Sequence, residues 1–529
     1  MSSAVQYDVA IIGSGFGGLG AALSLAERGY KVGLFETLKY PGGCAGTFAR
    51  RGYRFEAGAT LSSGFGEHQL FKRWIDQHHL DIELEWLDPV VHFRAPQFSL
   101  DIPPQRERLI DLFLKQPDAP RENIKRFFNH QAHIADTLWA LFDDADLLPP
   151  WNAGSLWRHL KRSAAYLPMM RDINRSLFDV LARYGLDQFK PLTLYLDALC
   201  QITVQCGLRE AEAPFALSTM DYYGRGTAHV IGGLGRLAES LCQGIAQQGG
   251  DVRLSDQVKE INRSERGGFE LKSRKGVSHA TCVVSNLLPS VTQRLIPKQE
   301  KWPAWSQQLQ SDLEHGWSAA MLYLVGKAPE SASGGAEHWQ MIGDSSRPMR
   351  EGNHIFCSIS HAQEHDRAPE GSRTMTVSTH IPAMKMRQLN HDEHGDYISG
   401  VQAQMRETFR ARCPEWAESV YFDSTASPRT FERFTGRDRG MVGGAPRRRG
   451  WRQYLSLGPR QLLPGLYLVG DSVFPGQSTL ATATGGTRVA EHLHRSWSRV
   501  HARRSPKTLP HQQIEQQASS KLSPLQNSK

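Results

Sequence analysis

The stretch YDVAIIGSGFGGLGAALSLAERGYKVGLFE, residues 7–36, decides the fold of this chain. Residues 9–12 are a short apolar run rich in β-branched side chains, which predicts a strand buried on both faces. A glycine cluster follows at once, apolar residues then recur at helical spacing as far as Gly29, and residues 31–35 predict a second strand. Strand, glycine turn, helix and strand in this order predict a parallel α/β unit.

The glycine cluster matches G-x-G-x-x-G, the pattern of a dinucleotide-binding turn. Gly13 permits the tight turn, Gly15 lets the backbone approach a pyrophosphate, and Gly18 lets the helix pack on the strand. Phe16 and Gly17 open the helix, whose free N–H groups and partial positive charge favour a phosphate. We therefore expect these five residues to bind a dinucleotide.

Two features follow the second strand. Glu36 stands at its end, where a carboxylate can accept hydrogen bonds from a ribose hydroxyl and would repel a 2′-phosphate. A second glycine cluster, PGGCAGTF at residues 41–48, then precedes RRGYRFEAGATLSSGF at residues 50–65. A domain that binds NAD alone has no use for a second Gly-Gly turn here, so the second cluster indicates a different dinucleotide.

The other end of the chain carries a pattern that fits the same site. Residues 463–493 read LPGLYLVGDSVFPGQSTLATATGGTRVAEHL, an apolar strand closed by Gly470-Asp471 and then a helix. TCVVSNLLPS at residues 281–290 predicts a buried strand that returns the chain to the nucleotide domain. RTFERFTGRDRGMVGGAP occupies residues 429–446.

These segments together resemble one branch of the FAD enzymes, namely phytoene desaturases, carotenoid isomerases, carotenoid 3,4-desaturases and retinol saturases. The wording PGGCAGTF with RGYRFEAGAT is similar to theirs almost residue for residue, and the resemblance runs from about residue 7 to residue 493. It implies FAD as the cofactor. It also implies an α/β fold with a discontinuous Rossmann domain of the glutathione-reductase type and a mixed α+β substrate domain, as in amine oxidases.

The resemblance also implies which residues bind FAD. In this family the second glycine turn lies beside the phosphates, Asp471 bonds a ribityl hydroxyl, and the backbone of Val258 meets the adenine. The helix after Gln477 points its N-terminus at the N1–C2=O edge of the flavin, where a helix dipole stabilises the anionic reduced ring. Besides the first turn, the expected cofactor-binding residues are Glu36, Gly42, Gly43, Cys44, Thr60, Val258, Gly470, Asp471, Gln477, Ser478 and Thr479.

The chain departs from its relatives at a few positions. Amine oxidases usually carry Arg at Cys44, which we interpret as a small packing residue and not a redox thiol, because no second cysteine lies near it in the sequence. Relatives often show Gly at Ser478, and Phe-Ser or Tyr-Ser where this chain has Ala-Thr at residues 483–484. Those positions line the reaction cavity in the family, so the substrate or the bond acted on can differ.

The function that the resemblance implies is oxidation chemistry on a carotenoid or related polyene. The reaction would be desaturation or cis–trans isomerisation with hydride transfer to or from flavin N5, and desaturation would need quinone or oxygen as electron acceptor. Three alternatives stay open: a flavin amine oxidase, a retinol-saturase-like reductase of another apolar substrate, and a binding protein without chemistry, like the escort proteins of prenylated small GTPases. Cys44 argues against the amine oxidase, and the complete glycine motif with Glu36 argues against the binding protein.

Acid–base candidates come from the stretch FERFTGRDRG, which is similar to the R-F-x-G-R-D-x-G motif of carotenoid isomerases. Arg437, Asp438 and Arg439 are the catalytic candidates, although each could equally form a surface ion pair. The sequence has no H-E-x-x-H, no paired Cys/His spacing, no G-x-S-x-G and no P-loop. We therefore expect no metal.

The length of 529 residues allows several segments to build two domains. We expect residues 1–75, 221–300 and 441–494 to form the FAD-binding domain and residues 76–220 and 301–440 to form the substrate domain. Residues 495–529 hold seven Lys or Arg against Glu515 alone, which gives this segment six of the eight net positive charges. The segment is also rich in Gln, Ser and Pro, so we expect a disordered basic tail, either solvated or held against anionic lipid.

Composition bounds the location of the protein. A hydrophobic content of 40% and a mean hydropathy of −0.44 are typical of a soluble globular protein, and no uncharged run approaches the ~18–20 residues that span a bilayer. No signal peptide is visible, and seven cysteines without a Cys-x-x-Cys pair fit a reducing compartment. We expect a cytoplasmic protein with no nucleic-acid partner.

Peripheral membrane contact is an open alternative. Residues 155–186 mix Trp, Leu and Met with Arg and Lys, a composition that could lie on a membrane surface. We favour helices that line an apolar tunnel with their basic residues in water, because most amphipathic helices face a core.

Overall fold

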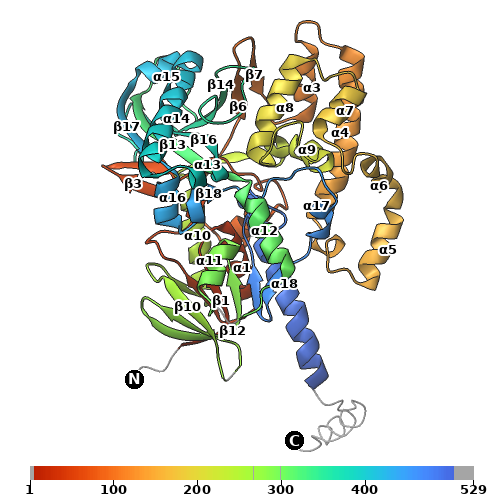
Figure 1. Ribbon diagram of the computed structural model, residues 1–529, viewed down its shortest axis with the longest axis vertical. Coiled ribbons are helices and arrows are strands. Elements are labelled where there is room, and N and C mark those ends of the chain that lie inside the picture. The colour runs from red at the N-terminus through yellow and green to blue at the C-terminus, as the bar shows by residue number, and fades with distance from the viewer. Residues whose placement is uncertain (1–4, 266, 298–299, 505–529) are drawn as a thin grey trace, which may run out of the picture. The chain divides into compact units, whose positions relative to one another are not determined.

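The structure is a computed structural model that describes residues 5–265, 267–297 and 300–504 (Figure 1). The chain divides into two compact units, Met1–Ala490 and Glu491–Lys529. Within the described part of the first unit, a mainly parallel sheet, a mainly antiparallel sheet and a group of helices can be distinguished. The predicted fold class, α/β with a Rossmann-type part and a mixed α+β part, is confirmed.

The sheet that carries the glycine turns is parallel at its centre. Its main path runs through β10 (Val258–Arg263), β11 (Phe269–Ser273), β12 (Gly276–Ser285), β1 (Val5–Ile12), β2 (Val32–Phe35) and β9 (Asp251–Arg253). Beside the end of β12 lie β20 (Leu466–Leu468) and then β19 (Arg460–Leu463). β1 pairs in parallel with β12 and β2, and Ile12 lies opposite both Ser285 and Phe35. The carboxyl ends of β1, β2, β12 and β20 therefore share one edge, the place where open α/β sheets bind ligands.

Helices cover this sheet closely. They are α1 (Phe16–Ala26), α10 (Leu234–Gln247), α11 (Pro289–Arg294), α12 (Ala304–Glu314) and the first residues of α18 (Thr479–Arg504). Every residue of α1 is buried. A Cβ on Gly20 would lie 2.4 Å from the carbonyl oxygen of Ala483, and one on Gly244 would lie 3.6 Å from Leu23. Neighbours on more than one side explain why α1 is built from Gly, Ala and Leu.

The second sheet is antiparallel except at one pair, where β14 runs parallel to β6. Its strands follow the order β17 (Val420–Ala426), β13 (Trp317–Lys327), β16 (Ser372–Pro382), β15 (His354–Ile359), β14 (Glu337–Ile342), β6 (Val91–Arg94) and β7 (Ser99–Ile102), with β18 (Met441–Val442) beside the start of β13. Alternate residues of β13 face opposite ways, as the period of a strand requires. Leu322 and Leu324 pack with α14 (His391–Arg412) and α15 (Pro414–Glu418).

The opposite face of β13 packs against the segment that follows the glycine turns. Met321 and Tyr323 share a core with Phe55 and Phe431. These aromatic residues lie on the hairpin β3 (Thr47–Arg50) and β4 (Tyr53–Glu56) and on α16 (Pro428–Thr435). The antiparallel sheet is thus joined to the nucleotide-type sheet through the hairpin that follows the second glycine cluster.

A helical region holds the largest of the described cores, rich in Leu and Phe. In Figure 1 it lies beside the antiparallel sheet. It contains α3 (Arg106–Leu114), α4 (Arg121–Phe142), α5 (Ala153–Lys161), α6 (Ser163–Met170), α7 (Leu177–Arg183), α8 (Lys190–Thr203) and α9 (Ala213–Thr219). Shorter elements complete the first unit: α2 (Leu70–Gln77), β5 (Leu84–Trp86), β8 (Ala228–Val230), α13 (Ala383–Gln388) and α17 (Arg452–Leu455).

The predicted domain boundaries stay a prediction. The parallel sheet draws its strands from residues 5–35, 251–285 and 460–468, and the antiparallel sheet from residues 91–102, 317–382 and 420–442. Of the expected basic tail, residues 495–504 belong to α18, and residues 505–529 lie outside the described part of the chain. In the described ranges, none of the helices is both long enough and apolar enough to span a bilayer.

Candidate active site

The first glycine turn, residues 13–18, joins β1 to α1. Gly13 has a φ of +93°, which favours glycine, and its N–H donates to the carbonyl oxygen of Phe35 at 2.8 Å. A Cβ on Gly18 would lie 2.0 Å from the carbonyl oxygen of Gly13, so the helix can pack on the turn only without a side chain there. α1 begins after Gly15 with no side-chain cap and no acidic residue in its first turn. Its first N–H groups are therefore available to an anion.

The second glycine turn, residues 41–46, lies directly against the first. Gly42 has a φ of +106°, and its N–H donates to the carbonyl oxygen of Ser14 at 2.9 Å. A Cβ on Gly43 would lie 3.5 Å from the Cα of Gly15. The two turns that the sequence separates by more than twenty residues thus form one glycine-lined surface.

Asn286 closes this surface from the side of β12. A Cβ on Gly15 would lie 2.6 Å from Asn286 Nδ2, and one on Gly17 would lie 2.6 Å from Asn286 Oδ1 and 2.8 Å from the N of Gly470. Asn286 follows β12 directly, so the carboxyl ends of β1, β12 and β20 meet here. The sequence analysis assigned no role to Asn286, although a polar residue at the end of a predicted buried strand was a signal for one.

Glu36 lies at the same edge, at the end of β2. It is 9% exposed, and its carboxylate accepts hydrogen bonds from Ser14 N at 2.8 Å and Leu38 N at 2.9 Å. Its carbonyl oxygen accepts from Asp256 N at 2.7 Å, which brings the buried Val258 at the start of β10 close to this corner. Glu36 therefore lies against Ser14 of the first glycine turn, and the contacts of Glu36 and Val258 with the adenosine end of a dinucleotide stay a prediction.

Asp471 forms a bidentate ion pair with Arg437. Arg437 donates from one guanidinium nitrogen to both carboxylate oxygens, at 2.8 and 3.0 Å, and from Nε to the carbonyl oxygen of Met441 at 2.5 Å. Burial alone would lower the pKa of Arg437, but the Asp471 carboxylate outweighs this effect and raises that pKa above its ordinary value. Arg437 is thus a fixed cation that positions a carboxylate next to Gly470.

Cys44 lies in the second turn, close enough to Arg437 and Asp471 for their charges to affect the pKa of its thiol. Burial raises the pKa of its thiol, and the positive charge of Arg437 only partly opposes the change. A thiol with a raised pKa stays protonated at neutral pH and is a poor nucleophile. This environment is consistent with the predicted packing role of Cys44.

Asp438 and Arg439 have partners other than Asp471. Asp438 accepts hydrogen bonds from Ser290 and Arg294, and although burial alone would raise its pKa, these bonds lower it. Arg439 pairs with Glu314 at 3.6 Å. Of the catalytic candidates that the sequence suggested, Arg437 is the one that contacts a predicted cofactor residue.

The residues that open α18 are held by side chains of other segments. Gln477 is held by Gln205, which donates to its side-chain oxygen at 2.5 Å. Thr479 Oγ1 lies 2.6 Å from Ser62 Oγ, and Ala59 N donates to the carbonyl oxygen of Cys44 at 3.1 Å. Residues 59–62, which include Thr60, therefore connect the second glycine turn to the start of α18.

These residues fit a flavin dinucleotide. The glycine surface has no room for a single Cβ at Gly15 or Gly17, while the uncapped start of α1 leaves backbone donors for a pyrophosphate. Glu36 bonds to Ser14 in the first turn, and Asp471 follows Gly470, which lies against Gly17; both carboxylates can accept hydrogen bonds from the hydroxyl groups of a ribose or a ribityl chain. In the described ranges, no group of three or more His, Cys, Asp or Glu residues could hold a metal ion.

Comparison with known proteins agrees with this geometry. Residues 16–494 match the family model described as flavin containing amine oxidoreductase. The chain is 27% identical to a chloroplastic prolycopene isomerase of Arabidopsis thaliana, over 92% of this chain and 82% of that protein. It is 23% identical to a neurosporene-forming phytoene desaturase of Rhodobacter capsulatus, over 91% and 93%.

A crystal structure of an oxidoreductase from Methanosarcina mazei has the same fold. Its TM-score is 0.62 at 16% identity, and the match covers 92% of this chain and all of that one. The match therefore shows a shared overall fold along most of the chain.

Ser478 gives a prediction about the start of α18. Its φ of +92° is strained for a residue with a Cβ, but its Oγ accepts a hydrogen bond from Ala481 N at 3.0 Å and so caps the helix. Ser478→Gly loses the cap and relieves the strain, whereas Ser478→Ala loses the cap and keeps the strain. We expect the Gly variant to be more stable than the Ala variant by about 1 kcal/mol, measured by calorimetry. Equal stability of the two variants would contradict the strained backbone.

Proposed function

Because the chain belongs to the family of flavin-containing amine oxidoreductases, we propose that it uses FAD to desaturate or isomerise an apolar polyene of the carotenoid type. The enzyme is a flavoprotein oxidoreductase. The observation that carries the choice of substrate is the similarity to prolycopene isomerase and phytoene desaturase along more than nine-tenths of the chain. A putrescine oxidase among the solved structures shares the fold at 15% identity.

FAD supplies a centre that accepts or donates a hydride when it is bound. The chain's own residues bind and orient it: the start of α1 and the second glycine turn would contact the pyrophosphate, and Glu36 the adenosine ribose. Arg437 holds Asp471 with its carboxylate ready to accept from the ribityl chain. The start of α18 would place the positive end of a helix dipole at the flavin ring, where it favours negative charge.

The site offers little acid–base chemistry of its own near the flavin end. Arg437 stays charged, Cys44 stays protonated, and Thr60 and Thr479 are hydroxyl groups. A site with few acid–base groups suits an apolar polyene, because such a substrate has no polar group to recognise and must be oriented by packing. Desaturation would also leave two electrons on the enzyme after each turnover, and we propose quinone or oxygen as their acceptor.

Pigment analysis in bacteria tests the substrate. Strains that accumulate phytoene, neurosporene, poly-cis-lycopene or all-trans-lycopene should change at least one pigment when this chain is produced, as read by chromatography and absorption. A longer conjugated system identifies a desaturase, an unchanged number of double bonds with altered geometry identifies an isomerase, and a shorter system a saturase. If every pigment stays unchanged while the purified protein holds FAD, the carotenoid proposal fails, and amines are the next substrates to try.

We further propose that α5, α6 and α17 contact an anionic membrane surface from which an apolar substrate is taken. None of the residues of α6 is buried, and large apolar side chains stand exposed on all three helices. The exposed apolar residues of this docking face are Trp151, Leu156, Trp157, Leu160, Leu167, Met170, Trp451 and Leu455, which are 52–80% exposed.

Charge and fold support the docking face. Exposed Lys161, Arg162 and Arg171 lie among its apolar residues, and Lys161 Nζ lies 5.2 Å from the ring of Trp157. Basic and aromatic side chains together are typical of helices at a lipid interface. Within residues 155–186, Val180 of α7 is buried, whereas α6 has no buried residue. That these helices line an apolar tunnel stays a prediction.

Vesicle flotation tests the docking face. We expect the full-length protein to float with vesicles of phosphatidylcholine and phosphatidylglycerol, and Trp157→Ser with Leu160→Ser to reduce the bound fraction at least about tenfold, since each buried apolar side chain contributes about 1.5–3 kcal/mol. Trp86→Ser is the matched control, because Trp86 is 59% exposed on β5, outside the docking face. Equal binding of the double variant and the control would contradict the proposal.

A further inference from the structure

A line of buried polar side chains leads away from Thr60 into the protein. Ser358 on β15 donates to Thr60 Oγ1 at 2.5 Å, and Nδ1 of His338 on β14 lies 2.7 Å from Ser358 Oγ. The ring of His229 on β8 lies 5.8 Å from the ring of His338, centroid to centroid, and its Nε2 lies 3.3 Å from Glu364 Oε2. All five residues are at most 7% exposed. We call them the Thr60 line.

The hydrogen positions in this line follow from its ends. Ser358 gives its proton to Thr60, so its oxygen must accept one from His338 Nδ1, which leaves Nε2 of a neutral His338 without a proton. Glu364 as a carboxylate only accepts, so His229 Nε2 carries a proton. The hydrogen bonds from His338 through Ser358 therefore point toward Thr60, whereas His229 donates in the other direction, to Glu364.

The line has a gap between its two imidazoles. His229 Nδ1 and His338 Nε2 are both buried, and neither has a hydrogen-bond partner in the described part of the chain. An unpaired buried nitrogen is costly, and a water molecule between two such groups commonly satisfies both. Such a water would donate to Nε2 of His338, and it would accept from or donate to Nδ1 of His229 according to the charge of that ring.

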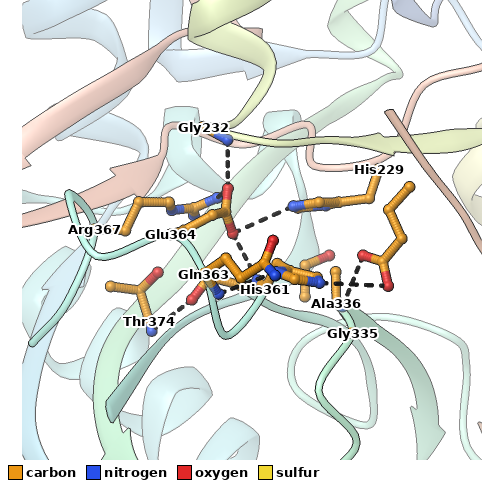
Figure 2. Close-up of polar contacts among 12 residues, drawn as sticks. His229, Gly232, Gly335, Ala336, His361, Gln363, Glu364, Arg367 and Thr374 are labelled. Atoms are coloured by element: carbon orange, nitrogen blue, oxygen red, sulfur yellow. Dashed lines mark hydrogen bonds and ion pairs between the residues drawn. The ribbon is translucent and has the colours of Figure 1, made fainter. Parts of the chain in front are cut away.

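Glu364 makes the far end of the line suited to hold a proton. Figure 2 shows its carboxylate between His229, Arg367 and the N–H of Gly232, which donates at 2.6 Å. Burial alone would raise the pKa of Glu364, but Arg367 and His229 hold it well below its usual range. An ionised carboxylate in the interior stabilises a positive imidazole beside it.

His338, in contrast, lies in surroundings that disfavour a positive charge on its ring. Burial and the neighbouring His229 lower its pKa well below the ordinary value, as do His92 and Arg367, while Glu364 opposes them. Its ring therefore stays neutral, so it can pass a proton from one nitrogen to the other without storing it. The contact of His229 with the Glu364 carboxylate therefore makes His229 the candidate for the charged ring, and His338 is the neutral ring between it and Ser358.

We propose that His229 and His338 hold a buried water molecule, and that His229, this water, His338 and Ser358 relay one proton to Thr60, while the Glu364 carboxylate balances the charge of a protonated His229. The relay breaks the Nδ1–H bond of His229, passes a proton through the water to Nε2 of His338, moves the Nδ1 proton of His338 to Ser358 and that of Ser358 to Thr60. Thr60 then gives its own proton to a carbon of the bound polyene, His229 changes from doubly protonated to neutral, and no electron moves. The reverse sequence takes up a proton.

This relay rests on the proposed function, because Thr60 is expected to face the flavin site. Its position supports that expectation, since Ala59 is hydrogen-bonded to the second glycine turn and Ser62 to Thr479 at the start of α18. Desaturation, saturation and acid-assisted isomerisation of a polyene each involve a proton at some step, while Arg437 stays charged and Cys44 stays protonated. The Thr60 line would exchange that proton.

The tautomer of His338 tests the relay without any substrate. In full-length protein labelled with ¹⁵N-histidine, with His338→Gln to assign its signals, we expect a neutral ring with its proton on Nδ1. A proton on Nε2 or a doubly protonated ring at neutral pH would overturn the relay whatever the substrate is. The expected tautomer together with unchanged pigments in the bacterial assay would keep the relay and reject the polyene.

Ser358 gives the kinetic test. Ser358→Ala removes the hydroxyl that links His338 to Thr60, so we expect turnover of the identified polyene to fall about 100-fold. Flavin content and melting temperature should stay unchanged. Ser358→Thr keeps the hydroxyl and should restore most of the turnover. Ser360→Ala is the matched control, because Ser360 lies on the same segment and its Oγ accepts from Thr374 N and makes no contact with Thr60. Unchanged turnover in Ser358→Ala, or an equal loss in both Ala variants, would overturn the relay. The Thr60 line would then have a structural role only.

Discussion

The close approach of backbone segments at one sheet edge is the constraint on which the rest of the structure depends. The first glycine turn, the second glycine turn, Asn286 and Gly470 come from four distant parts of the sequence, and they meet so tightly that a Cβ at Gly17 would lie within 2.8 Å of two of them. Such contact is possible only where parallel strands end together and glycine removes the side chains. The groups that this surface offers are therefore backbone N–H donors, which the phosphates of a dinucleotide require.

Buried charges connect this edge to the rest of the chain. Arg437 fixes Asp471 at one end of the glycine surface. Farther inside, Arg367 lies 3.4 Å from both Glu56 and Glu364, and Glu56 accepts from Leu234 N at 3.0 Å at the start of α10. Each charge has a partner of opposite sign, as burial demands. These ion pairs and hydrogen bonds therefore hold together the hairpin after the second turn, α10 and the antiparallel sheet around the site.

The local parts of the fold could be predicted from the sequence, because their signals are local. The run before Gly13, the glycine spacing and the strand before Asp471 each identify an element and its ligand chemistry within a few residues. The pairing of Arg437 with Asp471 and the position of Asn286 could not be predicted in this way, since they depend on contacts between distant segments. The same holds for the positive φ of Ser478 and for the exposure of α5 and α6, whose composition suits a core and a surface equally well.

The central claim is that the glycine surface binds FAD, and the amount of FAD released from purified protein tests it most directly. We compare wild-type protein, Gly17→Ala and the control Gly395→Ala, whose Cβ would meet nothing within 4 Å on α14. The account predicts about one FAD per chain in the wild-type and control proteins, and a loss of most of it in Gly17→Ala with secondary structure intact by circular dichroism. Full FAD content in Gly17→Ala, or none in the wild-type protein, would contradict it.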